Sequence, residues 1–132
     1  EEADRQLLQL DIFTRVFTDA SLDGWNGFGM VVQSYFKMAP AVIDYLIDLA
    51  ARTGRRIPLR LVKGAYWDSE IKNAQVEGLS GYPVFTRKAN TDVSYVACAH
   101  KLLQAREAFY PQFATHNAQT IATITELAGE RL

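Results

Sequence analysis

The amino-acid sequence predicts an α/β fold in which parallel strands alternate with helices. Three short apolar runs, too brief to be helices, lie at residues 28–35, from Leu59 onward, and at residues 110–117. Segments with the periodicity of amphipathic helices precede, separate and follow these runs. An alternation of this kind is typical of parallel strands joined by crossover helices.

Residues 1–35 predict a helix followed by the first strand. Residues 1–17 have the periodicity of an amphipathic helix. We expect its apolar side to consist of Leu8, Ile12, Phe13, Val16 and Phe17. Residues 18–27 contain Ser, Asp, Asn and Gly, which is typical of a loop. The strand at 28–35 is apolar almost throughout, as in strands covered on both faces, and its polar residue Gln33 lies near the carboxyl end.

The middle of the chain supplies a helix, predicted at residues 41–52, and then a central strand. The central strand carries two cations, Arg60 and Lys63, among apolar neighbours. Gly64 removes the side chain at the strand end, so the backbone there can approach a bound molecule closely. Two aromatic residues follow at once. These features suit a cofactor-binding strand end, and an edge strand with solvated cations and a glycine turn fits them equally well.

The second half of the chain predicts a loop, three helices and the last strand. Thr91 and Asn117 are both suited to cap a helix N-terminus. The segment 82–88 contains two adjacent cations and is expected to be a more exposed loop or a short extended piece. The strand at 110–117 ends in polar residues. The helices are expected at residues 69–77, 92–106 and 118–128.

Polar side chains lie at the carboxyl end of every predicted strand. Gln33 ends the first, the segment 60–67 ends the second, and the segment 115–117 ends the third. In parallel α/β folds, ligands bind beyond the carboxyl ends of the strands, so we expect these groups to converge on one ligand. The sequence contains neither G-x-G-x-x-G nor a Walker loop, which argues against a Rossmann dinucleotide site and a P-loop nucleotide site.

The composition is that of an ordinary globular domain. The 132 residues are 48% hydrophobic and 22% charged, with a net charge of −1, so charge gives no reason to expect nucleic-acid binding. A single cysteine, Cys98, excludes an internal disulfide and fits a reducing compartment. No signal peptide, transmembrane-length apolar run or metal-ligand spacing is seen. Residues 1–4 are already helical in character, so we expect the chain to be cut from a longer one.

Several segments of the sequence match one known family. They are Trp25–Gly29, Val32–Gln33, Arg60–Trp67, Asp68–Lys72, Gly81–Lys88, Thr91–Tyr95 and Tyr110–Asn117. In these segments the chain closely resembles the proline dehydrogenase domain of the bacterial bifunctional flavoprotein proline utilization A. The resemblance covers essentially all of residues 1–132 without an evident insertion.

The resemblance implies a distorted (βα)8 barrel that binds FAD at the carboxyl ends of its strands. Residues 1–132 would be the middle portion of this barrel, about strands four to six with flanking helices. The family oxidises L-proline to Δ1-pyrroline-5-carboxylate by hydride transfer to flavin N5 and passes the electrons to a membrane quinone. The implied partners are the remainder of the barrel and a linked aldehyde dehydrogenase domain. The implied location is the cytoplasm, including the inner face of the bacterial membrane.

The resemblance also assigns roles to individual residues. Arg60 would lie beside the flavin ring and stabilise the charge of the reduced flavin, and Tyr66 would form a wall of the substrate pocket. Core packing fits Trp67 as well as a cofactor contact does, and a solvated position fits Lys88 almost as well as a cofactor contact. The residues expected to contact FAD are Val31, Gln33, Arg60, Val62, Lys63, Gly64, Ala65, Trp67, Thr86, Lys88, Thr115, His116 and Asn117.

The chain is shorter than a complete barrel, which takes about 250 residues. The family's catalytic aspartate would lie before Glu1, and the arginine pair that binds the proline carboxylate would lie after Leu132. We therefore expect residues 1–132 alone to be inactive, or structured only with help from neighbouring segments. Two other interpretations remain: a different (βα) barrel enzyme with a phosphate-bearing ligand, and a non-enzymatic module in which Arg60 and Lys63 bind an acidic partner.

Overall fold

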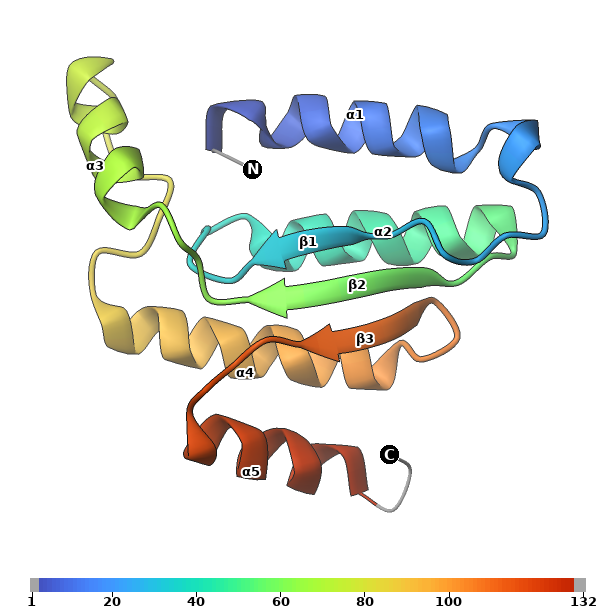
Figure 1. The fold of residues 1–132 in the computed structure, drawn as a ribbon. Helices are drawn as coiled ribbons and strands as arrows, with labels where there is room; N and C mark the ends of the chain where they lie inside the picture. Colours follow the sequence, from blue (N-terminus) through green and yellow to red (C-terminus); the bar gives the residue numbers. More distant parts are fainter. Residues whose placement is uncertain (1–2, 130–132) are drawn as a thin grey trace.

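The computed structural model describes residues 3–129, which form helices and strands in alternation (Figure 1). Two short 3₁₀ helices, Ala3–Arg5 and Ala20–Leu22, flank the first α-helix. The principal elements are α1 (Gln6–Phe17), β1 (Met30–Gln33), α2 (Ala39–Thr53), β2 (Ile57–Val62), α3 (Trp67–Val76), α4 (Lys88–Gln104), β3 (Phe109–Phe113) and α5 (Ala118–Ala128).

The three strands form one parallel sheet in the order β1-β2-β3, which confirms the predicted α/β class. Val31 lies opposite Arg60 in the register of β1 and β2, and Arg60 lies opposite Gln112 in the register of β2 and β3. Helices α2 and α4 cover one face of the sheet, and α1 and α5 lie beyond its two edges (Figure 1). All three strands point toward the end of the sheet where α3 begins (Figure 1).

The core lies between the sheet and the helices α2 and α4. Alternate residues of β2, namely Ile57, Leu59 and Leu61, point into this core and have an exposed fraction of 0%. The residues between them point to the opposite face, where Arg60 is exposed and Val62 is half-buried. Within residues 3–129 this second face is therefore open, whereas the apolar run of the first strand had suggested that both faces are covered.

Helix α1 buries a different side from the one predicted. Phe13 and Phe17 are buried as expected, but Leu8, Ile12 and Val16 are exposed. The aromatic side chains decide the orientation, because Phe13 stacks on Phe17 with ring centroids 5.4 Å apart and on Phe28 of the following segment at 5.0 Å. The other buried residues of the helix are Gln6 and Leu10.

The N-terminus of α4 also differs from the prediction. The helix begins at Lys88 instead of residue 92, so Thr91 lies inside the helix and does not cap it. The preceding segment is pinned to the end of β1, where the backbone N–H of Phe85 donates to the carbonyl oxygen of Tyr35 over 2.9 Å. The predicted cap of α5 is confirmed, since the Asn117 side chain accepts a hydrogen bond from the Thr120 backbone N–H over 2.9 Å.

Two broader properties follow from the described residues. No helix in this part of the chain is long and apolar enough to cross a membrane. Across residues 3–129, no group of three or more His, Cys, Asp or Glu side chains is placed to hold a metal ion.

Candidate functional site

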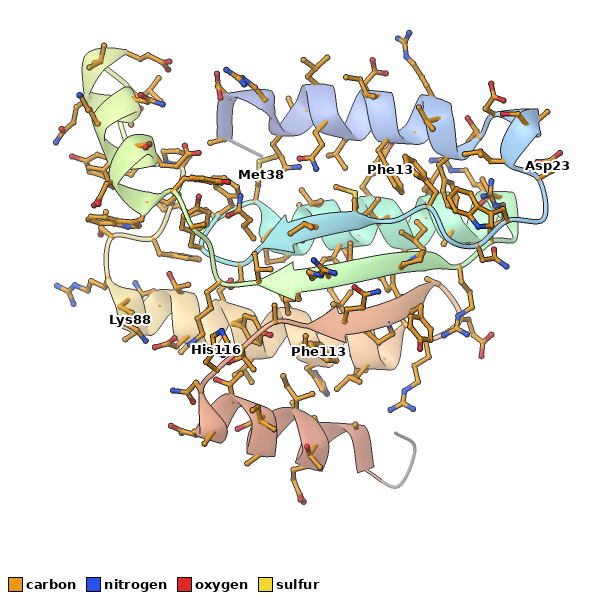
Figure 2. The ribbon with its side chains drawn as sticks, viewed as in Figure 1. Phe13, Asp23, Met38, Lys88, Phe113 and His116 are labelled. Carbon is orange, nitrogen blue, oxygen red and sulfur yellow. The ribbon has the colours of Figure 1, made fainter. Side chains whose placement is uncertain are left out.

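A hollow of about 680 Å³ lies at the carboxyl ends of the three strands. The structure brings together in its lining most of the residues expected to contact a cofactor. Figure 2 shows two of them, Lys88 and His116, at this same end of the sheet. The hollow is lined by Val31, Gln33, Arg60, Val62, Lys63, Gly64, Ala65, Lys88, Ala114, Thr115, His116 and Asn117.

Trp67 and Thr86 are the two predicted cofactor contacts that do not line this hollow. They line an adjoining hollow of about 480 Å³, which shares Lys63, Gly64 and Lys88 with the first. Trp67 is exposed and its indole N–H donates to the carbonyl oxygen of Phe85 over 2.9 Å, so it is not a core residue. Because Lys63 and Gly64 are among the shared residues, both hollows border the segment that follows β2.

Arg60 occupies the centre of the open sheet face. Its register partners Val31 and Gln112 project to the same face because paired residues of parallel strands share a side of the sheet. The Nε–H of Arg60 donates to Oε1 of Gln112 over 3.3 Å, and the side chain is otherwise exposed toward the hollow. Gln112 was not predicted from the sequence; it lies two residues before Ala114, which lines the hollow, and therefore on the same side of the chain.

Gln33 links the end of β1 to the loop after β2. Its side chain is buried, and Oε1 accepts a hydrogen bond from the backbone N–H of Ala65 over 3.2 Å. A buried amide held in this way fixes the path of the chain past Gly64. It also places a polar group in the wall of the hollow.

The backbone conformation and the surroundings of position 64 require a glycine. Its φ is +145°, a region that side chains rarely adopt, and a Cβ atom at this position would lie 2.5 Å from the ring of Tyr35. The residue therefore has no room for a side chain on the Tyr35 side, while its backbone borders the hollow. Tyr35, which sequence analysis did not single out, forms the floor beneath this glycine.

Two lysines of the hollow share one carboxylate. Nζ of Lys63 lies 2.5 Å from Oδ1 of Asp92, and Nζ of Lys88 lies 2.7 Å from Oδ2 of the same side chain. Hydrogen bonds from Lys63 and then Lys88 lower the pKa of Asp92, so this carboxylate is ionised at neutral pH. Asp92 was not predicted to belong to the site, because the helix was expected to begin at residue 92 and Lys88 to lie in the loop before it.

The segment 114–117, which connects β3 to helix α5, lines the edge of the hollow. Asn117 is the N-cap of α5, and its backbone N–H donates to Oγ1 of Thr115 over 3.1 Å. The first turn of α5 therefore starts at the hollow, and the positive end of a helix dipole favours an anionic group there. His116 lies between these residues and is exposed.

Tyr66 lies outside both hollows. It is the N-cap residue of α3 and its side chain is exposed, so within the described residues it does not belong to the core. Its predicted place in the wall of a substrate pocket would require groups other than those of residues 3–129 on its open side.

These features define an α/β protein with a cationic, glycine-bordered ligand site at the carboxyl ends of its parallel strands. The family model for proline dehydrogenase matches residues 1–132, and the chain belongs to this family. It is 62% identical to the bifunctional protein PutA of Klebsiella aerogenes and 57% identical to that of Rhizobium meliloti, each over 130 residues that cover 98% of the chain. The chain spans only about a tenth of the length of these relatives.

Solved structures of the same family have the same fold as this chain. A crystal structure of a proline utilization A variant from Bradyrhizobium japonicum aligns with a TM-score of 0.95 at 60% identity, over 97% of this chain and 13% of that one. A proline utilization A from Bdellovibrio bacteriovorus, inactivated by N-propargylglycine, aligns with a TM-score of 0.93 at 34% identity, over the same shares.

Proposed function

We propose that this chain is part of an FAD-dependent proline dehydrogenase that oxidises L-proline to Δ1-pyrroline-5-carboxylate, the first step of proline catabolism to glutamate. The observation that carries the proposal is the hollow at the strand ends, in which residues 31–33, 60–65 and 114–117 meet. Membership of the proline dehydrogenase family supports the choice of substrate.

The residues of the hollow fit the chemistry of FAD. Lys63, Lys88 and the N-terminus of α5 would bind its diphosphate, since they supply cations and backbone N–H groups at one place. Gly64 would allow the backbone to lie close to the cofactor. Gln33 and Arg60 would meet the flavin ring, where Arg60 provides a fixed cation on the open face of β2. When bound, the flavin supplies the hydride acceptor.

The remaining parts of the proposal concern groups outside the described residues. We propose that the chain forms about strands four to six of a (βα)8 barrel, and that other strands pair with the edges of β1 and β3 that are unpaired within residues 3–129. The relatives are named as bifunctional proteins, which supports a linked second enzyme domain. We also propose that a quinone accepts the electrons and that the protein is located in the cytoplasm, in contact with the inner membrane face. Residues 1–132 alone are expected to be inactive.

The test is a visible absorption spectrum of the intact protein before and after anaerobic addition of L-proline. We expect flavin bands that bleach when proline is added, and no such bands for residues 1–132 expressed alone. Flavin bands that proline fails to bleach would leave the cofactor in place and require another substrate. A protein without flavin would refute the proposal and favour a phosphate-bearing ligand at the same strand ends.

A further inference from the structure

Asp92 is not in the lining of the hollow, but it bonds to two of the hollow's cations at once. Its two carboxylate oxygens are 2.5 Å from Nζ of Lys63 and 2.7 Å from Nζ of Lys88. Lys63 follows β2, and Lys88 begins α4, so one side chain joins two elements that are separate in the chain. We call Lys63, Asp92 and Lys88 the lysine–aspartate bridge.

The local electrostatics of α4 do not account for this arrangement. Lys88 is the first residue of the helix, where the positive end of the helix dipole disfavours a cation. A lysine four residues before an acid is also the less favourable order for a pair on a helix. Residues that oppose local preferences are expected chiefly at functional sites.

The two ammonium groups also repel each other. Both lysines line the same hollow, and both are held within hydrogen-bond distance of one carboxylate. Lys63 is the more enclosed of the two, with a side chain that is 28% exposed against 79% for Lys88. Without a shared anion, repulsion would drive the more exposed lysine, Lys88, away from the hollow and into solvent.

We propose that Asp92 is a positioning residue for FAD: it holds Lys63 and Lys88 together so that both ammonium groups bind the diphosphate. This inference rests on the proposed function, because it takes FAD to be the ligand. An ammonium group has three donors, so each lysine can bond to Asp92 and still offer two donors to phosphate oxygens. The bridge as a whole retains one net positive charge, which suits an anionic ligand.

Positioning and simple charge attraction predict opposite changes in FAD affinity when Asp92 is replaced. Replacing Asp92 with asparagine removes a negative charge close to an anion, and charge alone would make FAD bind more tightly. Loss of positioning would have the opposite effect, because the two lysines would separate and their order would have to be restored on binding. Weaker binding in spite of the more favourable charge is therefore specific to a positioning role.

The experiment measures the dissociation constant of FAD for the cofactor-free intact protein, by quenching of flavin fluorescence. We expect Asp92→Asn to raise this constant about fivefold to tenfold. The midpoint potential of the bound flavin should not change, because the diphosphate is remote from the ring. The matched control is Asp48→Asn, which removes an acid that pairs with a cation four residues away on α2, 2.8 Å from Nε of Arg52. This control should leave the dissociation constant within about twofold.

Tighter or unchanged binding of FAD by Asp92→Asn would overturn the proposal, as would an equal effect of Asp48→Asn. If Asp92→Asn fails to fold, as judged by circular dichroism, Lys88→Met carries the test, because this exposed side chain can be replaced with little risk to folding. Unchanged binding in Lys88→Met would then overturn the proposal. A wild-type protein that binds no FAD would refute the proposed function itself, which keeps the two failures distinguishable.

Discussion

The two faces of strand β2 separate the core from the candidate site. On the face toward α2 and α4, Ile57, Leu59 and Leu61 have no exposed surface. On the opposite face, Arg60 is exposed and borders the hollow together with Val62. The six residues of this strand thus alternate between the core and the candidate site.

The difference explains how a strand can carry a cation without loss of stability. A charge that points into the core would need a paired partner there, whereas Arg60 points to the open face, where its Nε–H donates to Gln112. Substitutions on one face should therefore change the free energy of unfolding, and those on the other should change the chemistry.

The largest effect is expected on the buried face. Leu61→Ala removes a fully buried side chain and leaves a cavity, so the free energy of unfolding should fall by about 2–5 kcal/mol. Urea denaturation of the cofactor-free intact protein measures this change. The control Val62→Ala, at a half-buried side chain on the open face, should lower the free energy of unfolding by less than about 1 kcal/mol. Equal losses for the two variants would contradict the division between the faces.

Sequence patterns alone predicted the fold class and the end of the sheet that holds the hollow. The alternation of apolar runs and helical segments predicted the α/β class. The polar strand ends at Gln33 and residues 115–117 predicted the end of the sheet at which the hollow lies. The buried side of α1 was mispredicted, because the stacking of Phe13 on Phe28 depends on tertiary contacts that periodicity does not contain.

The individual partners within the site were harder to predict. Lys63 and Asp92 are 29 residues apart in the chain, and Arg60 and Gln112 are 52 apart. Pairs this distant depend on strand register and helix placement, so a single sequence does not reveal them. The assignment of a flavin came from the family resemblance and not from the spacing of these residues.

A smaller effect is expected on the open face, and on rate instead of stability. Arg60→Lys keeps the charge but loses the planar donor group and its bond to Gln112. We expect flavin reduction by L-proline to slow about tenfold, or 1.4 kcal/mol, with unfolding changed by less than about 0.5 kcal/mol. Anaerobic stopped-flow absorbance measures the rate. The control Arg56→Lys makes the same change just before β2, where the side chain bonds to the Phe109 carbonyl oxygen, and should leave the rate unaltered.

Normal flavin reduction in Arg60→Lys, combined with loss of binding to an acidic protein partner, would contradict the division of roles. It would favour the non-enzymatic binding module, in which Arg60 serves recognition. Slowed reduction with normal flavin content would locate the effect at the chemical step.

The smallest effect is expected at Tyr95 of α4, which belongs to the core on the buried face of the sheet. Its side chain is fully buried, and its hydroxyl group donates to the carbonyl oxygens of Leu61 and Ala114, at 3.4 Å and 3.3 Å. Both bonds are long, and the Leu61 oxygen also accepts from the Ala114 backbone N–H over 3.0 Å. Tyr95→Phe should therefore lower the free energy of unfolding by only about 0.5–1 kcal/mol at pH 7.

Ionisation of the same hydroxyl group should make the free energy of unfolding depend on pH in the alkaline range. Burial raises the pKa of Tyr95 from 10.0 to about 12. Between these values the unfolded chain releases the phenolic proton and the folded chain keeps it, so the contribution of Tyr95 to stability is complete below pH 10 and lost as pH rises toward 12. Urea denaturation from pH 8 to 11 should show a shallower decline for Tyr95→Phe than for the wild type. Identical declines would mean that the phenol ionises as readily in the folded protein as in the unfolded one, and that water reaches this part of the core.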